Sequence, residues 1–356
     1  MTLSVMFWNV ENFFDWRNDS TTVSDGEFSA RGERHWTWKR FQAKANAFAK
    51  AILWVGDETG RLPDIIGLAE VENAFVLRQV LQKTALRKLD YKYVHYDSPD
   101  RRGIDVALLY RSSVLELIDS KPCHLYAADS LMATRDILLC EFGRKQSVIP
   151  GLTVKRSSGD REVFGSVGNG EKGARFAVLV NHHPSKYGGA SESEPRRRIA
   201  VERLRFLADS LVAAGIDRII ACGDFNDTPD NPVFRLLEPA LVPLHLDLFR
   251  RGEGTIKYDG KWDLIDHFYA SPGWAVSWSP ASSSASPGRS SVAPSPLTEG
   301  SPGVSSLSMR ILRIPFLLTR DTAHSGERPL RTYLGPRHTG GVSDHLPILL
   351  ELECPP

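Results

Sequence analysis

An aspartate and an asparagine follow one apolar run of the chain, one residue apart from each other. The run is Ile219-Ile220-Ala221-Cys222, and the polar pair is Asp224 and Asn226. A carboxylate in this place can bind a hard cation or hold a water molecule, and an amide can donate to a phosphate oxygen. Because the same pattern is also a common turn, the pair by itself is compatible with either a turn or a site.

Two other apolar runs end in polar residues. Glu70 closes the run Ile65–Ala69, and a carboxylate directly after such a run is unfavourable unless it is paired or binds a metal. Asn9 ends the first apolar run and is followed closely by Glu11. An ordinary asparagine cap at a strand end is the alternative interpretation of Asn9.

Histidines lie at two further places in the same pattern. His182 comes directly after the run 176–181, and His345 follows Asp344 just before the last apolar run. Asp266 lies inside an apolar strand pattern, which is unusual unless the carboxylate orients another group, such as a histidine. A lone histidine is more often structural, so these residues gain weight only from their occurrence together.

Strand and helix patterns alternate along the chain and must position these residues. Apolar runs rich in β-branched residues predict strands at 4–9, 65–69, 105–110, 176–181, 218–222, 264–270 and 347–352, and further strands near 91–96, 114–117 and 137–142. Helical spacing predicts helices at 36–55, 74–86, 194–214 and 232–237. This mixture predicts an α/β layered domain with helices packed outside the sheets. The ends of its strands are suited to a site because rigid backbone opens into loops there.

Composition and charge limit the class of protein and of partner. With 42% hydrophobic and 24% charged residues, the 356-residue chain fits a globular protein and is a poor match for disordered or collagen-like classes. The net charge of +1 gives no attraction of the whole protein for a polyanion. A nucleic-acid substrate would therefore need a local cationic patch, and the charge slightly favours small or lipidic substrates.

One large domain over residues 1–356, interrupted by an insertion, is the expected organisation, although the length also permits two domains. Residues 277–308 contain 18 Ser or Pro among 32, too few apolar groups to offset the entropy of ordering, and are expected to be a disordered insertion. Residues 156–173 are expected to form a hairpin loop. Asp15–Arg34 is expected to be a long loop near the site.

The cysteines and residues 1–14 indicate where in the cell the protein is expected to be. Cys123, Cys140, Cys222 and Cys354 form no CxxC pair and are expected to be buried free thiols. No stretch is long and apolar enough to span a bilayer. Residues 1–14 lack the basic start and cleavage site of a signal peptide, so we expect a cytoplasmic monomer, while a signal removed from upstream of this sequence stays open.

Taken together and in this order, the motifs resemble the endonuclease/exonuclease/phosphatase superfamily, which includes deoxyribonuclease I, exonuclease III-type repair nucleases, sphingomyelinases and inositol-polyphosphate 5-phosphatases. The resemblance extends from Trp8-Asn9-Val10-Glu11 to Ser343-Asp344-His345, and is closest to a bacterial branch that reads Asn-Val-Glu-Asn-Phe-Phe-Asp near its start. It implies a four-layer α/β sandwich of the deoxyribonuclease I type, with two packed mixed β-sheets flanked by helices.

The resemblance also implies roles for the motif residues. The metal-side residues would be Glu70 as the principal ligand, Asn9, Asp344 and Glu11. The residues at the phosphate and the attacking water would be His182, Asp224, Asn226, Asp266 and His345. Asp266 would orient His345, and either Asp224 or the His345–Asp266 pair would serve as the base. Oxygen ligands suit Mg²⁺ or Mn²⁺, and no Cys/His cluster has zinc spacing.

The substrate contacts depart from the common pattern. Ala69 stands where many members have Gln, and a branch-specific loop beginning with His183 follows His182. The expected substrate-binding residues are Asn181, Arg102, Arg135, Lys186 and Arg331. For each of the four cations, an ordinary surface position is the alternative interpretation.

The sequence therefore predicts a divalent-metal-dependent phosphoester hydrolase, with a nuclease acting on nucleic acid as the leading hypothesis. A phosphatase or phosphodiesterase acting on a lipid head group, an inositol phosphate or a nucleotide is the alternative. A catalytically inactive binding module is a third possibility, against which the complete set of motif residues argues.

Overall fold

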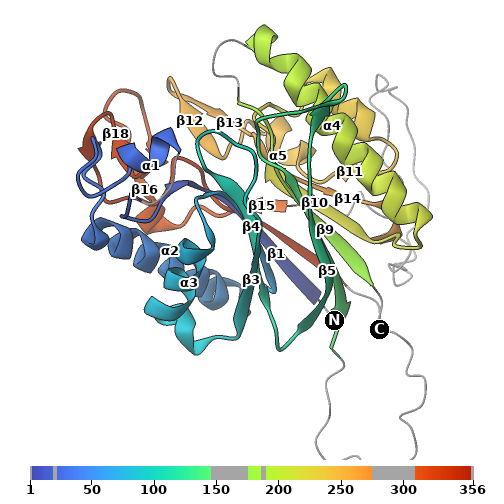
Figure 1. The fold of residues 1–356 in the computed structure, drawn as a ribbon, viewed down its shortest axis with the longest axis horizontal. Helices are drawn as coiled ribbons and strands as arrows, with labels where there is room; N and C mark the ends of the chain where they lie inside the picture. The colour runs from blue at the N-terminus through green and yellow to red at the C-terminus, as the bar shows by residue number, and fades with distance from the viewer. Residues whose placement is uncertain (1, 19–21, 146–174, 186–189, 275–308, 354–356) are drawn as a thin grey trace, which may run out of the picture.

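The computed structural model describes residues 2–18, 22–145, 175–185, 190–274 and 309–353, and within these ranges two six-stranded sheets form the centre of the molecule (Figure 1). The first sheet has the order β15 (Met309–Ile311), β20 (Ile348–Glu353), β1 (Thr2–Phe13), β2 (Ile65–Val71), β4 (Asp105–Arg111) and β3 (Tyr91–His95). The second has the order β11 (Val242–Pro243), β14 (Asp266–Ala270), β10 (Ile219–Asp224), β9 (Phe176–His182), β8 (Ile137–Arg144) and β5 (Leu115–Cys123).

Both sheets are mixed, and their central strands are related in the same way. β1 pairs in parallel with β2 and antiparallel with β20. β10 pairs in parallel with β9 and antiparallel with β14. In each sheet, therefore, two parallel strands end at one edge, and the residues that follow them are brought to the same end of the molecule.

Alternation along the strands divides the core into three layers of contact. Val178 and Val180 of β9 pack with Phe7 of β1 in a cluster that joins the two sheets. Their neighbours Ala177 and Leu179 face the other way, as expected for a period of two. The two apolar faces of each sheet explain why apolar residues run almost without interruption through β1, β2, β9 and β10.

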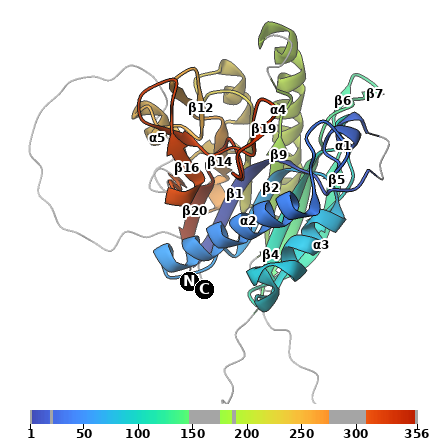
Figure 2. The same cartoon turned by 90° about the vertical axis from the view of Figure 1, so that its left-hand side faces the viewer.

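Helices cover the outer faces of both sheets (Figure 2). α2 (Trp38–Thr59) and α3 (Ala74–Lys83) pack on the first sheet, and α4 (Ala190–Ala213) covers the second. Asn73 caps α3 by accepting a hydrogen bond from the amide of Val76 at 3.0 Å. The resulting order of helix, sheet, sheet and helix confirms the predicted four-layer α/β sandwich.

Smaller elements complete the described part of the chain. The short helices are α1 (Val23–Glu27), α5 (Leu246–Arg250) and the 3₁₀ turns Ala85–Lys88, Pro232–Leu237, Pro272–Trp274 and Pro315–Leu317. The short strands are β6 (Tyr126–Ala127), β7 (Ser130–Leu131), β12 (Ile256–Tyr258), β13 (Lys261–Asp263), β16 (Leu318–Arg320), β17 (Glu327–Pro329), β18 (Tyr333–Leu334) and β19 (Arg337–His338).

Most predicted elements are found, with different bounds. The strand expected at 114–117 is part of the longer β5, and the helix expected at 232–237 is a 3₁₀ turn. The polar stretch 15–34 contains α1. The insertion expected at 277–308 and the loop expected at 156–173 lie outside the described residues.

Two further expectations concern helices and thiols. None of the helices within the described ranges is both long and apolar enough to cross a membrane. Cys123, Cys140 and Cys222 are buried free thiols, as predicted, and Cys354 lies outside the described residues.

Candidate active site

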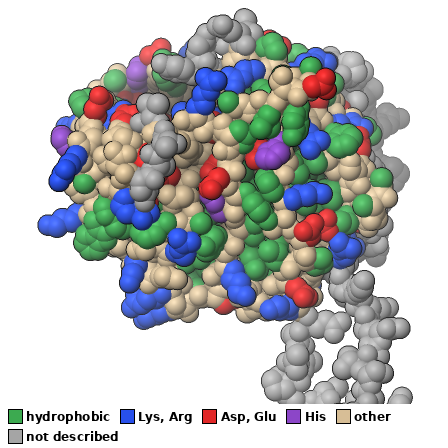
Figure 3. All heavy atoms as spheres, viewed as in Figure 1, with side chains coloured by type: hydrophobic (Ala, Val, Ile, Leu, Met, Phe, Trp, Pro, Cys, Tyr) green, Lys and Arg blue, Asp and Glu red, His purple; other side chains and the backbone are tan. Residues whose placement is uncertain are grey.

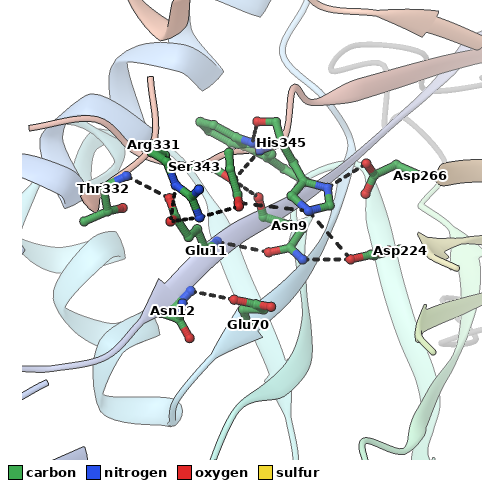
Figure 4. Close-up of polar contacts among 12 residues, drawn as sticks. Asn9, Glu11, Asn12, Glu70, Asp224, Asp266, Arg331, Thr332, Ser343 and His345 are labelled. Atoms are coloured by element: carbon green, nitrogen blue, oxygen red, sulfur yellow. Dashed lines mark hydrogen bonds and ion pairs between the residues drawn. The ribbon is translucent and has the colours of Figure 1, made fainter. Parts of the chain in front are cut away.

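The predicted site residues meet at one end of the sandwich, where strands of both sheets end (Figure 4). β1 supplies Asn9 and Glu11, β2 supplies Glu70, and β9 and β10 supply His182 and Asp224. Asp266 begins β14, and Asp344 and His345 lie in the loop before β20. Residues from position 9 to position 345 therefore share one polar cluster between the two sheets.

Asp224 lies at the centre of this cluster and is almost completely buried. Its Oδ2 accepts a hydrogen bond from Asn9 Nδ2, and its Oδ1 accepts one from the amide of Asn226, both at 2.9 Å. Burial raises the pKa of Asp224 to about 7, and the charge of His345 opposes this shift. A carboxylate with a pKa near neutrality can exchange a proton under physiological conditions.

His345 and Asp266 form a buried pair. Nδ1 of His345 lies 2.8 Å from Oδ2 of Asp266, and its Nε2 lies 3.8 Å from Oδ2 of Asp224. Burial lowers the pKa of His345, but Asp266, Asp224 and Asp344 outweigh it and raise this pKa well above the ordinary value. The imidazole is therefore held in its charged form, with Nε2 directed to the centre of the cluster.

His182 lies between the buried aspartate and Glu70. Its Nε2 is 3.7 Å from Asp224 Oδ2 and 3.9 Å from Glu70 Oε1. Burial, followed by the charges of Arg135 and Arg102, lowers the pKa of His182 well below its ordinary value. Unlike His345, this imidazole is therefore neutral.

The adjacent histidine faces the opposite side of the strand. The ring of His183 packs against Phe225, with ring centroids 4.6 Å apart. This agrees with the expectation that neighbouring histidines in a strand point in opposite directions. Only the first of the two contributes its ring to the cluster.

Three carboxylates gather on the other side of the cluster. Glu70 Oε2 accepts a hydrogen bond from the amide of Asn12 at 2.8 Å. Glu11 accepts from the amide of Thr332 at 2.7 Å and from Arg331 Nε at 3.2 Å. The same guanidinium lies 2.9 Å from Oδ2 of Asp344. We call Glu11, Glu70 and Asp344 the acid group.

The acid group fits a divalent cation. Burial, followed by the charge of Asp344, raises the pKa of Glu11 to about 7, so the surroundings of Glu11 stabilise its negative charge poorly. A hard cation would relieve this repulsion, and the carboxylate oxygens are the donors that Mg²⁺ and Mn²⁺ prefer.

A tighter set of possible ligands is Asp224, Asp266 and His345, whose donor atoms lie within 4.8 Å of one another. Within this trio, Oδ2 of Asp266 and Nδ1 of His345 are already bonded to each other at 2.8 Å, so these two atoms are not free to bind a metal.

The backbone around the cluster is strained. Glu11, Asn12, Glu70 and Asn226 have φ values of 45°, 50°, 65° and 52°. Non-glycine residues seldom adopt this left-handed conformation, and where they do, it is often at functional sites. Nothing in the sequence pattern predicts these angles, so this signal was accessible only from the structure.

Sequence analysis missed Lys44, a buried lysine of α2. Its Nζ donates to the backbone carbonyl of Glu11 and, at 2.9 Å, to the hydroxyl of Thr332. Burial lowers the pKa of Lys44 to about 8. In the sequence, Lys44 is one cation within a helical pattern, and only its burial distinguishes it.

The expected substrate-binding residues have different surroundings. Arg135 is buried and donates to Asp100 at 3.0 Å and to the carbonyl of His183 at 2.6 Å. Arg102 is 45% exposed, with Nε 3.7 Å from Asp100. Arg331 lies at the acid group, and Lys186 lies outside the described residues. Arg135 and Arg102 thus share the carboxylate of Asp100.

Asn181 corrects the prediction. Its side chain is completely buried, and Nδ2 donates to the carbonyls of Leu179 and Cys222 at 3.0 and 3.2 Å. Strand alternation turns it away from His182, toward the outer layer that α4 covers. A substrate contact through this amide is therefore not supported, because its position after an apolar strand did not reveal which face it occupies.

Lys and Arg side chains are scattered over the face of the molecule drawn in Figure 3, among acidic, histidine and hydrophobic side chains. Among the residues coloured in that view, no large patch of positive charge is visible.

The comparisons with known proteins agree with this fold. A profile described as the endonuclease/exonuclease/phosphatase family matches residues 4–148 and 156–278. A search of curated protein sequences finds no match. The sequence pattern of a family thus extends over most of the chain.

Solved structures with the same architecture share little sequence. The catalytic domain of human Nocturnin, with bound sulfate, is 17% identical with a TM-score of 0.52, covering 99% of this chain and 94% of that one. A mannosyl-6-phosphatase from Bacteroides thetaiotaomicron is 14% identical with a TM-score of 0.53, covering 99% and 100%. Truncated TDP2 from Caenorhabditis elegans is 14% identical with a TM-score of 0.53, covering 99% and 98%. At identities this low, the superposition of whole chains establishes a shared fold and no more.

Proposed function

This chain belongs to the endonuclease/exonuclease/phosphatase family, and from that premise we propose that it is a divalent-cation-dependent phosphodiesterase acting on nucleic acid. The observation that carries the proposal is the position of His182 Nε2, 3.7 Å from Asp224 and 3.9 Å from Glu70. A phosphate beside this nitrogen has a carboxylate suited to proton transfer on one side and the acid group on the other.

Asp224 is the residue we assign to the attacking water. It is fixed by Asn9 and by the amide of Asn226, and its raised pKa lets it accept a proton near neutral pH. His345 lies close enough to share this proton, because its Nε2 is 3.8 Å from the same oxygen. The pair Asp224 and His345 therefore acts as one coupled proton acceptor and donor.

Three side chains are proposed to hold the non-bridging phosphate oxygens. His345 presents a charged imidazole and His182 a neutral one, which can donate a single hydrogen bond. The amide nitrogen of Asn226 uses one hydrogen on the carbonyl of His183 at 2.9 Å, and its second hydrogen can be donated to phosphate. Such fixed donors stabilise charge that develops in the transition state.

Glu70, Asp344 and Glu11 would hold a divalent cation, which would supply neutralisation of the phosphate charge. The chain's own contribution is to keep these carboxylates together. Arg331 bridges Glu11 and Asp344, and the amide of Asn12 holds Glu70.

A phosphodiester suits the site better than a phosphomonoester. A diester carries one negative charge, whereas a monoester carries about 1.5 to 2 at neutral pH. The two buried or half-buried arginines nearest the cluster already have acidic partners: Arg331 has Glu11 and Asp344, and Arg135 has Asp100. The second charge of a monoester would therefore find no uncommitted partner in these two arginines.

The test is a substrate panel with the full chain and Mn²⁺ or Mg²⁺. Single- and double-stranded DNA, RNA, a lipid phosphodiester and inositol phosphates are assayed at about 50 and 200 mM salt, with Glu70→Ala as the control. We expect cation-dependent cleavage of nucleic acid that is lost in Glu70→Ala. Salt-insensitive turnover of inositol phosphates, without cleavage of nucleic acid, would reject the nuclease proposal.

A further inference from the structure

A cavity of about 360 Å³ lies beside the acid group. Glu11, Asn12 and Arg331 form its wall toward the cluster, and Phe28, Arg34 and Tyr333 form its far wall. It thus lies between the segment that follows α1 and the β18–β19 hairpin. Its volume is within the range of ligand pockets, about 300–1,000 Å³, and the reaction proposed above leaves it without a role.

The leaving group of the proposed reaction would depart toward this cavity. Figure 4 shows Asp224 on one side of Asn9 and His345, and Glu11 with Arg331 on the other. In phosphoryl transfer the attacking and leaving oxygens lie roughly in line through phosphorus. A water activated at Asp224 therefore expels its leaving group toward Glu11 and Arg331, which line the cavity.

The far wall is held in place by contacts among its residues. Phe28 and Tyr333 pack edge to face, with ring centroids 6.0 Å apart. The guanidinium of Arg34 lies 5.7 Å from the first ring centroid and 5.2 Å from the second. It is fixed by Glu27 and by the carbonyl of Gly335, both at 2.7 Å. The rings of Phe28 and Tyr333 are themselves buried, so the surface that this wall offers to a ligand is the part-exposed guanidinium plane of Arg34, a group on which nucleic-acid bases can stack.

The charges around the cavity favour an uncharged occupant. Arg34 is paired with Glu27, and Arg331 is paired with Glu11 and Asp344. Glu33 adds a negative charge at the exposed rim. A second phosphate group would find no uncommitted arginine among these residues, whereas the edge of a base could bond to the side-chain amide of Asn12 or the carboxylate of Glu33.

We propose that this cavity binds the nucleoside on the leaving side of the scissile phosphate. The inference rests on the proposed function and specifies it further: the chain recognises a base and sugar beyond the bond it breaks. In the step itself, the bond between phosphorus and the leaving oxygen breaks as water oxygen bonds to phosphorus, and the leaving nucleoside takes up a proton.

The test compares two substrates that differ only in the leaving group. One is a dinucleoside monophosphate, and the other is the nucleoside methyl phosphate in which methanol replaces the leaving nucleoside, each prepared in both linkage polarities. The variants Glu33→Trp and Pro336→Trp place a large side chain at the exposed rim of the cavity. Glu58→Trp, at the exposed far end of α2, is the matched control.

The measured quantity is kcat/KM for the dinucleoside divided by kcat/KM for the methyl ester. We expect at least one rim variant to lower this ratio by about tenfold, the size of a lost base stack, and the control to leave it unchanged. The second rim variant keeps the test open if the first fails to fold.

Two other outcomes would overturn the inference in distinguishable ways. If wild-type protein cleaves both esters and neither folded rim variant changes the ratio, the cavity is not a nucleoside subsite, although the proposed function stands. If wild-type protein cleaves neither ester but hydrolyses a phosphomonoester such as p-nitrophenyl phosphate, the proposed function fails and the subsite fails with it.

Discussion

The side-chain amide of Asn9 donates to the carboxylate of Asp224 at 2.9 Å, although the two residues are 215 positions apart in the chain. The first lies on β1 and the second on β10, so this bond joins the two sheets at the end where the polar cluster forms. The orientation of the proposed base is therefore set by how the sheets pack.

Removal of this bond is expected to shift the pH dependence of hydrolysis. The bond lowers the pKa of Asp224 against the effect of burial. In Asn9→Ala this pKa rises further, so the acidic limb of the kcat/KM profile moves to higher pH, and activity at pH 7 falls about tenfold. Asp224→Asn should lose about 10²–10⁴ at every pH, since the base itself is gone. Unchanged profiles in folded variants would exclude Asp224 as the proton acceptor.

The His345–Asp266 pair makes an opposite prediction for the alkaline limb. Asp266 is the main group that raises the pKa of His345. In Asp266→Asn the imidazole should lose its proton at lower pH, and the alkaline limb should move to lower pH with it. NMR titration of the His345 ring measures the pKa directly. A titration that matches wild type would show that Asp266 does not hold the imidazolium.

Arg331 makes a prediction about cation binding that requires no assay of activity. It is the guanidinium that bridges Glu11 and Asp344. In Arg331→Met the acid group loses this compensation, so the metal-free protein should melt at lower temperature, and Mn²⁺ should raise the Tm by more than in wild type.

Arg310→Met is the matched control for this experiment, since it removes an exposed arginine that pairs with Glu351 far from the acid group. Its Mn²⁺ response should equal that of wild type. A smaller Tm increase in Arg331→Met than in wild type would place the cation elsewhere.

The sequence predicts the layers of this fold because polar residues mark the ends of its apolar strands. Glu70 and Asp224 close runs that are buried on both faces, and those two positions were identifiable as site residues from this pattern. The face of the sheet on which Asn181 lies could not be predicted, because the side chain of a residue at a strand end can point to either face. The left-handed backbone at Glu11 and Asn226 also lies beyond pattern analysis, since tertiary contacts impose it.

The partners of the cations could not be predicted for a related reason. Lys44 reaches Glu11 and Thr332 only because α2 crosses the end of β1, and its sequence neighbourhood is an ordinary amphipathic helix. Arg331 finds Glu11 across 320 residues. Contacts between such distant residues depend on the packing of whole layers.

A pair of stacked histidines predicts how stability depends on pH. The rings of His245 and His267 lie 4.1 Å apart and nearly parallel, and both are buried. Burial lowers the pKa of His245 to about 4 and that of His267 well below its ordinary value. Between pH 6.5 and 4 the unfolded chain binds protons that the folded chain does not, so the free energy of unfolding falls as the pH falls.

For His245 the loss should reach about 3 kcal/mol at pH 4. Urea unfolding at several pH values measures it. His245→Gln should have a lower stability at pH 7.5 and a shallower pH dependence than wild type. His324→Gln, at a partly exposed histidine, is the control. Parallel pH dependences in His245→Gln and wild type would show that this ring does not stay neutral.

The position of β20 between β15 and β1 in the first sheet has a consequence for synthesis on the ribosome. One side of β1 pairs with residues 348–353, and Ser343 completes its bond to Asn9 across 334 residues. Once β1 has been translated, a nascent chain therefore carries an unpaired strand side until β20 follows, which invites aggregation or chaperone binding. It lacks His345 over the same interval, so a polypeptide that has not yet reached this residue would be an inert enzyme.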